Sequence, residues 1–149
     1  MVKFIGDYNV KLDDKGRLVF PVAFKELCLM QGAKPVFVVK KNLFSKCLEM
    51  YLYSEWEAES DGVRAKLNPF NVEHDIFWRA YLQNRALVSP DEKIGRITIP
   101  KELLEQIGVK KDVVFCGKDY KIEIWSKEEY AKTFISEEDF VKLAEKILR

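Results

Sequence analysis

A short segment of this chain occurs twice, and this repeat constrains the fold more than any other feature. The first copy, at residues 12–26, reads LDDKGRLVFPVAFKE, and the second, at residues 91–105, reads DEKIGRITIPKELLE. Aligned on their glycines, the copies share four residues, namely Gly16/Gly95, Arg17/Arg96, Pro21/Pro100 and Glu26/Glu105. Repeats must be recognised first, because missing them misassigns the fold. A duplicated unit of acid, turn, Gly-Arg, strand and Pro-initiated helix indicates a paired surface rather than a single catalytic pocket.

Length and cysteine content narrow the classes of protein that fit this sequence. The chain has 149 residues, and a unit of roughly 45–50 residues forms only a marginal core alone, so we expect the two copies to share one fold. Three cysteines without ligand spacing argue against a disulfide framework and a zinc site. No apolar run approaches the roughly 18 residues of a membrane helix, and the first ten residues lack the apolar core of a signal peptide. We therefore expect a cytoplasmic protein without a metal or other cofactor.

The charges are unevenly distributed although the net charge is only +1. Residues 1–54 contain nine basic and five acidic residues, whereas residues 55–92 contain four basic and eight acidic residues. A basic region of this kind can bind phosphate, although most charge runs are simply solvated surfaces. Four lysines of this region, Lys11, Lys40, Lys41 and Lys46, fit either interpretation.

Local patterns predict short strands and capped helices on both sides of an unrepeated connector. Strands are predicted over Val2–Ile5 and Tyr8–Leu12, and a hairpin over residues 112–125. Helix N-caps are predicted at four polar residues, Ser54, Asn71, Ser126 and Ser136. The connector has an apolar stripe at helical spacing, which we expect to pack on the core or on a neighbouring subunit.

The repeated turn places an acid four residues before an arginine. In the first copy Asp13 can pair with Arg17 across a reversal made by Gly16, and Lys15 adds a second positive charge. In the second copy the fixed alignment places Glu92 opposite Asp13 and Ile94 opposite Lys15, with Lys93 one position earlier. Arginine suits either a structural ion pair or planar recognition of phosphate and guanine. The two loops are thus related in shape but differ in charge.

Taken together, these motifs resemble the MraZ family, which is built from two SpoVT/AbrB-like swapped-hairpin domains. The resemblance covers LDDKGRLVFP, the segment EMYLYSEW at residues 49–56, the second motif GRITIP and the segment IEIWSKEEY. It implies an α+β fold of two tandem, β-barrel-type halves related by a pseudo-two-fold repeat. We expect the first half over 1–56, a helical connector over 57–86, the second half over 87–133 and a C-terminal helix over 134–149.

The family resemblance implies sequence-specific binding to double-stranded DNA. The expected protein is a transcriptional regulator, usually a repressor, that acts on direct repeats upstream of the division and cell-wall gene cluster. It would assemble into a ring-like homo-oligomer and associate with the nucleoid, without membrane or small-molecule substrate. The expected DNA-contacting residues are Lys15, Arg17, Lys93 and Arg96, and the expected loop-orienting residues are Asp13, Gly16, Glu92 and Gly95.

Two other classes of function are less consistent with the sequence than DNA binding. An AbrB-like antitoxin or protein-binding module would bind a partner protein, but such antitoxins usually carry one motif copy. An enzyme is not expected, because the sequence has no nucleophile elbow, no phosphate-binding Gly-rich loop before a helix and no cluster of His and Cys.

Overall fold

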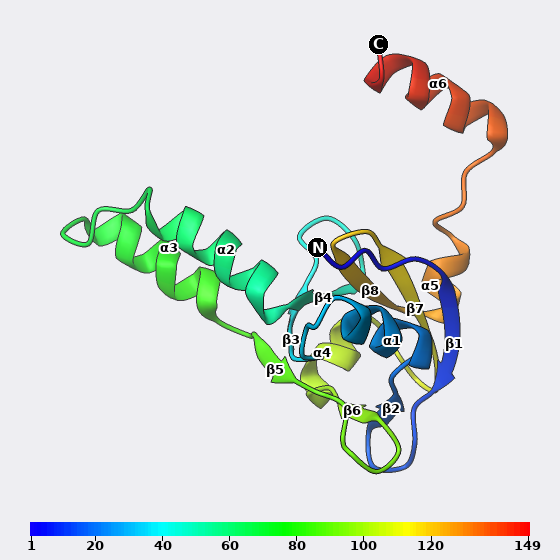
Figure 1. Cartoon of the computed structure of the whole chain (residues 1–149). Coiled ribbons are helices and arrows are strands. Elements are labelled where there is room, and N and C mark those ends of the chain that lie inside the picture. The colour runs from blue at the N-terminus through cyan, green and yellow to red at the C-terminus, as the bar shows by residue number, and fades with distance from the viewer.

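The computed structural model describes all 149 residues and has eight strands and six helices (Figure 1). The strands are β1 (Asp7–Lys11), β2 (Arg17–Val19), β3 (Phe37–Lys41), β4 (Leu48–Leu52), β5 (Ala86–Val88), β6 (Arg96–Thr98), β7 (Asp112–Lys118) and β8 (Lys121–Ser126). The helices are α1 (Val22–Met30), α2 (Tyr53–Arg64), α3 (Val72–Leu82), α4 (Lys101–Gln106), α5 (Lys127–Ala131) and α6 (Glu137–Ile147). The predicted α+β class is confirmed, and all strand pairs are antiparallel.

Strands from both halves of the chain join in one six-stranded sheet, whose order is β1-β7-β8-β4-β3-β5. Strands β1 and β4 lie in the first half of the chain, and they pair with β7 and β8 in the second half. The remaining strands, β2 and β6, pair with each other in a separate two-stranded ribbon at the lower end of the molecule in Figure 1. Because these pairings cross between the copies, the two halves share one fold.

One main hydrophobic core fills the space between the sheet, the ribbon and helices α1 and α4. The inward residues of the ribbon, Leu18 and Ile97, are fully buried in it. Phe24 of α1 is also fully buried and meets the rings of Phe4 and Tyr8 edge-on, with centroids 5.5 and 5.1 Å apart. The core therefore holds the ribbon by its inner face, and the outer face of the ribbon remains free.

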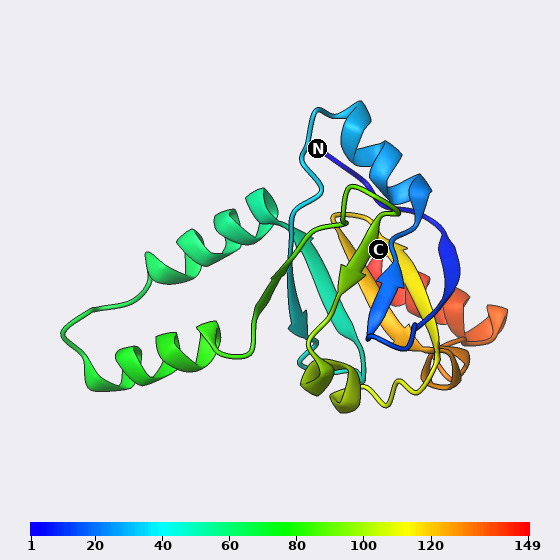
Figure 2. The same cartoon turned by 90° about the horizontal axis from the view of Figure 1, so that it is seen from below.

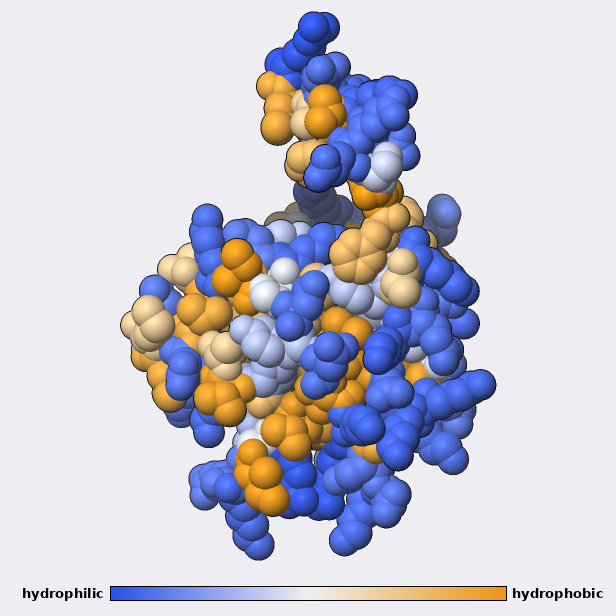
Figure 3. Space-filling view, turned by 90° about the vertical axis from the view of Figure 1, so that its right-hand side faces the viewer, coloured by the Kyte–Doolittle hydropathy of each residue, from blue (hydrophilic) through white to orange (hydrophobic).

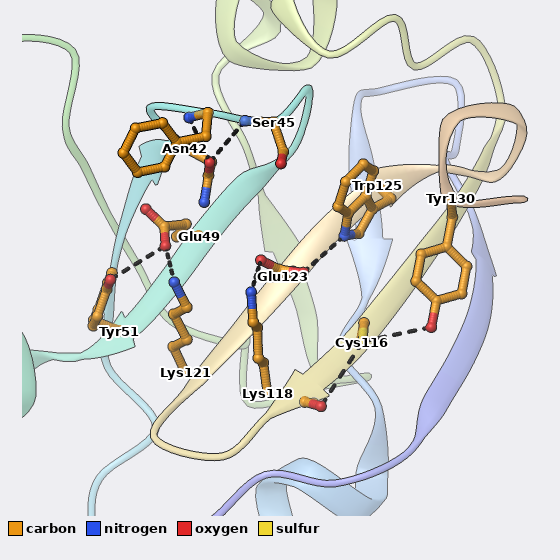
Figure 4. A network of polar contacts seen from close by, with 12 residues as sticks. Asn42, Ser45, Glu49, Tyr51, Cys116, Lys118, Lys121, Glu123, Trp125 and Tyr130 are labelled. Carbon is orange, nitrogen blue, oxygen red and sulfur yellow. Dashed lines mark hydrogen bonds and ion pairs between the residues drawn. The ribbon is translucent and has the colours of Figure 1, made fainter. Parts of the chain in front are cut away.

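The other face of the sheet carries a buried polar network beside a small apolar cluster of Cys47, Val114 and Trp125. Both β4 and β8 are buried along their whole length. Their core-facing residues alternate with polar residues such as Glu49 on β4 and Lys121 on β8, which point to the opposite face (Figure 4). Loop residues 42–46 lie beside this network, where Asn42 accepts hydrogen bonds from the backbone N–H groups of Phe44 and Ser45.

The N-terminal segment crosses the β7–β8 hairpin instead of forming the predicted strand over Val2–Ile5. Only Phe4 bridges the sheet, through two backbone hydrogen bonds with Asp119. The N–H of Gly117 donates to the carbonyl of Gly6 at 2.8 Å. A Cβ atom at Gly117 would lie 2.5 Å from the backbone nitrogen of Ile5, so the close crossing requires glycine at this position.

Helices α2 and α3 form a hairpin that projects sideways from the sheet, and α6 stands apart from the body at the other side (Figures 1 and 2). The predicted caps at Asn71, Ser126 and Ser136 are confirmed, since each side chain accepts a hydrogen bond from the backbone N–H three residues later. The predicted cap at Ser54 is wrong. Helix α2 begins directly after β4, at Tyr53, so Ser54 already lies inside its first turn.

Candidate nucleic-acid interface

The β2–β6 ribbon brings the two Gly-Arg motifs together. In its register Arg17 lies opposite Thr98, and Val19 lies opposite Arg96. Since alternate residues of a strand point to the same side, Arg17 and Arg96 occupy diagonal positions on the outer face of the ribbon. Both repeat loops lie at this lower end of the molecule (Figures 1 and 2).

The first loop, residues 13–16, is closed by Asp13. Its Oδ1 atom accepts hydrogen bonds from the backbone N–H groups of Lys15 at 2.9 Å and Arg17 at 2.8 Å. Its Oδ2 atom accepts from Nε of Arg17 at 2.8 Å. The N–H of Asp13 donates to the carbonyl of Arg17 at 2.9 Å, and Gly16 adopts a φ of 78° at the reversal. The carboxylate therefore fixes both the loop backbone and the arginine side chain.

The second loop, residues 91–95, is closed in the same way by Asp91, which overturns the expectation that Glu92 orients it. Oδ1 of Asp91 accepts from the backbone N–H groups of Lys93, Ile94 and Gly95 at 2.8 to 3.1 Å. Its Oδ2 atom accepts from Nε of Arg96 at 3.2 Å. Glu92 is exposed and forms no hydrogen bond or ion pair in the structure.

The physical reason for this difference is the length of the second loop. Its closing backbone bond runs from the N–H of Asp91 to the carbonyl of Arg96 at 2.9 Å, so the turn contains one residue more than the turn between Asp13 and Arg17. The extra residue moves the equivalent acid back by one position. Gly95 retains its role, with a φ of 81°.

Both arginines present hydrogen-bond donors to the solvent. Each uses Nε for its aspartate, and neither terminal amino group donates to another group of the chain. The side chains of Arg17 and Arg96 are 27% and 22% exposed. Lys15 and Lys93 are exposed in the two loops. The surface thus combines two oriented guanidinium groups with two exposed point charges, an arrangement suited to phosphate and base edges.

Backbone donors and the arginines lower the pKa of both aspartates. For Asp13 the largest cause is the N–H of Arg17, and for Asp91 it is the N–H of Ile94. Each carboxyl is therefore ionised more readily in the folded chain than at its ordinary pKa of 3.8. A lowered folded-state pKa stabilises the fold above the ordinary value, and the stabilisation is lost as the pH falls below it.

We expect the charge of Asp91 to contribute measurably to stability at neutral pH. An Asp91→Asn variant should unfold at a lower temperature than the unaltered chain at pH 7. The difference in unfolding temperature between the two proteins should narrow as the pH falls below about 3.8, because the unaltered carboxyl then becomes protonated on unfolding. Thermal unfolding followed by circular dichroism from pH 7 to pH 3 measures this difference, and a constant difference would contradict the assignment.

Three further lysines near the first loop were not identified from the sequence. Lys111 is held there by its carbonyl, which accepts from the N–H of Leu12 at 2.8 Å. Lys110 and Lys101 line a groove of 640 Å³ beside Lys15. The adjacent basic pair Lys110-Lys111 was visible in the sequence, but its position near the first loop depends on the pairing of β1 with β7. Of the other lysines considered, Lys40 and Lys46 form ion pairs with Glu59 and Glu129, away from the ribbon.

The chain contains no arrangement of three or more His, Cys, Asp or Glu side chains that could hold a metal ion. None of its helices combines the length and apolar character required to cross a membrane.

Comparison with known proteins identifies the family of the chain. The family described as "MraZ protein, putative antitoxin-like" matches residues 82–149. A transcriptional regulator MraZ from Bacteroides thetaiotaomicron is 35% identical, over 99% of this chain and 94% of the relative. Its counterpart in Bacteroides fragilis is 35% identical, over 100% of this chain and 93% of the relative. The counterpart in Clostridium acetobutylicum is 33% identical, over 97% of this chain and 96% of the relative. The chain, with its two aspartate-closed Gly-Arg loops, therefore belongs to the MraZ family of transcriptional regulators.

Proposed function

We propose that this protein is a sequence-specific repressor that binds double-stranded DNA through the outer face of the β2–β6 ribbon. The observation that carries the proposal is the pair of oriented arginines, Arg17 and Arg96, on that one face. Two-stranded β-ribbons can enter the major groove, and arginine to guanine is the commonest specific contact there. Both loops contribute on this reading, with Lys15 and Lys93 as phosphate contacts.

We propose direct repeats upstream of the division and cell-wall gene cluster as the target, in a protein of the cytoplasm that associates with the nucleoid. Two arginines and a few lysines make a weak site in a single chain. A ring of several copies would present several such sites to neighbouring repeats and gain affinity through effective concentration. The family resemblance supports both the ring and the description of the two halves as swapped-hairpin units of a barrel.

Salt dependence tests this proposal directly. The protein should shift a DNA fragment from upstream of its own gene, and the logarithm of its affinity should fall linearly with the logarithm of salt concentration, by about 0.9 per phosphate contact. Titrations by fluorescence anisotropy between 50 and 200 mM salt, with a scrambled fragment as control, measure both slope and specificity. Absence of binding at the lowest salt would contradict the proposal.

A second candidate function is an antitoxin-like or protein-binding module. The exposed amphipathic helix α6 and the similarity to a family described as antitoxin-like favour it. It predicts a partner protein that co-purifies from the native host in a stoichiometric complex, and that no longer binds when α6 is removed. Binding to the upstream DNA without such a partner would favour the repressor.

A further inference from the structure

Helix α6 exposes a continuous apolar face although it belongs to a folded chain. Phe140, Leu143 and Ile147 recur at helical spacing and are 64%, 46% and 69% exposed. No residue of the helix is buried, and apolar side chains gather along one side of it in Figure 3. An isolated helix of this length is only marginally stable in water, so its order requires a surface that covers this face.

An unfilled groove lies between helix α3 and the loop that joins β3 to β4. It encloses about 810 Å³, and six of its seventeen lining residues are apolar or aromatic, whereas the others are polar or charged. Leu43 and Phe44 form the wall on the loop, where they are 89% and 94% exposed. Phe77 and Tyr81 form the wall on α3. The aliphatic and aromatic side chains of an amphipathic helix can pack between such walls in the manner of helix-in-groove recognition.

The charges of the groove and of the helix are complementary. Five cationic side chains line the groove against two acidic ones, namely Lys40, Lys41, Arg85, Lys118 and Lys121 against Glu49 and Glu59. Three of the lysines are paired with glutamates, and Lys41 donates to the carbonyls of Asn42 and Ser45. Arg85 has no ion pair and stacks on the ring of Tyr81. The first turn of α6 consists of three acids, Glu137, Glu138 and Asp139. A helix inserted here would bring anions to the unpaired cation.

We propose that α6 of one copy docks into this groove of the next copy, with its acidic first turn toward Arg85. The inference rests on the proposed self-association and names the surfaces that would carry it. Helix and groove are different surfaces, so the contact is heterologous: each copy offers one helix and one groove. Contacts of this type close into rings when the rotation between copies allows. The detached position of α6 in Figure 1 is the position from which it can reach a neighbour.

Two single substitutions test the proposal without disturbing the folded body, because both residues are exposed. Leu143→Asp damages the helix but leaves the groove, and Phe44→Asp damages the groove but leaves the helix. Each variant alone should lose the higher-order assembly in sedimentation velocity and sediment as a single chain. An equimolar mixture should form a species of two chains, since the intact helix of the second variant fits the intact groove of the first.

A matched control uses Lys142→Asp, which places a carboxylate on the opposite face of the same helix and should leave assembly intact. The proposal is overturned if the unaltered protein is a single chain, if Phe44→Asp still assembles, or if the mixture does not associate. The last result would indicate helix-to-helix pairing or docking of α6 within its own chain. Binding of a DNA fragment with one repeat should survive in both variants, so failure of the interface is distinguishable from failure of the DNA-binding loops.

Discussion

Replacing Arg17 and Arg96 together with alanine should abolish specific DNA binding while leaving the fold intact. A good bidentate contact of arginine to a base contributes about 1–3 kcal/mol of discrimination, which corresponds to a factor of roughly 5 to 150. Loss of both arginines removes two such contacts from every copy that engages a repeat. Either single variant should lose part of the affinity, because the ribbon presents both side chains on one face. Anisotropy titrations of the upstream and scrambled fragments measure the ratio of the two affinities.

Matched substitutions show whether the effect belongs to the ribbon. Arg79→Ala removes an arginine that is paired with Asp75 on α3, remote from the loops, and should leave DNA binding unchanged. Asp91→Ala should weaken binding because it frees the side chain of Arg96, whereas Glu92→Ala should not. Equal specific affinity of the double arginine variant and the unaltered protein would exclude the ribbon as the DNA-reading surface.

The assignment of Glu92 shows what an ungapped repeat comparison can miss. Alignment on the glycines kept both copies in one register, and this register places Glu92 opposite Asp13. The chemistry of turns favoured an aspartate instead of Glu92. An aspartate side chain accepts hydrogen bonds from backbone N–H groups two or three residues ahead more readily than the longer glutamate. The neighbouring Asp91 makes two such bonds, to Lys93 and Ile94, and a third to Gly95, four residues ahead. Allowing one inserted residue in the turn would have identified it from the sequence.

Short sequence patterns predicted local structure. Features that depend on contacts between distant parts of the chain could not be predicted from such patterns. The caps at Asn71 and Ser136 followed from residues next to the helices they begin. The diagonal placement of Arg17 and Arg96 depends on the pairing of two strands far apart in the chain. The groove beside α3 depends on how the projecting helical hairpin is placed relative to the loop between β3 and β4, and no spacing of residues encodes its width.

Replacing Lys121 with methionine should cost about 3–5 kcal/mol of unfolding free energy, because it leaves a buried carboxylate without its cation. The register of β4 and β8 places Glu49 directly opposite Glu123, and like charges in such a pair repel. Lys121 is bonded to Glu49, and Lys118 lies 3.1 Å from Glu123 (Figure 4). Glu49 and Lys121 are only 6% and 7% exposed, so water cannot replace the missing charge.

The Glu49–Lys121 ion pair as a whole should contribute much less to the free energy of unfolding than the removal of one partner costs. A buried ion pair replaced by apolar residues of similar size is often neutral or stabilising, so the double variant Glu49→Leu/Lys121→Met should recover most of the loss. Lys3→Met, at an exposed ion pair with Asp119, is the control and should change stability by no more than about 0.5 kcal/mol. Urea unfolding at several protein concentrations separates these effects from association. If Lys121→Met costs no more than Lys3→Met, the network is not a determinant of stability, and its lysines are free to serve the neighbouring groove.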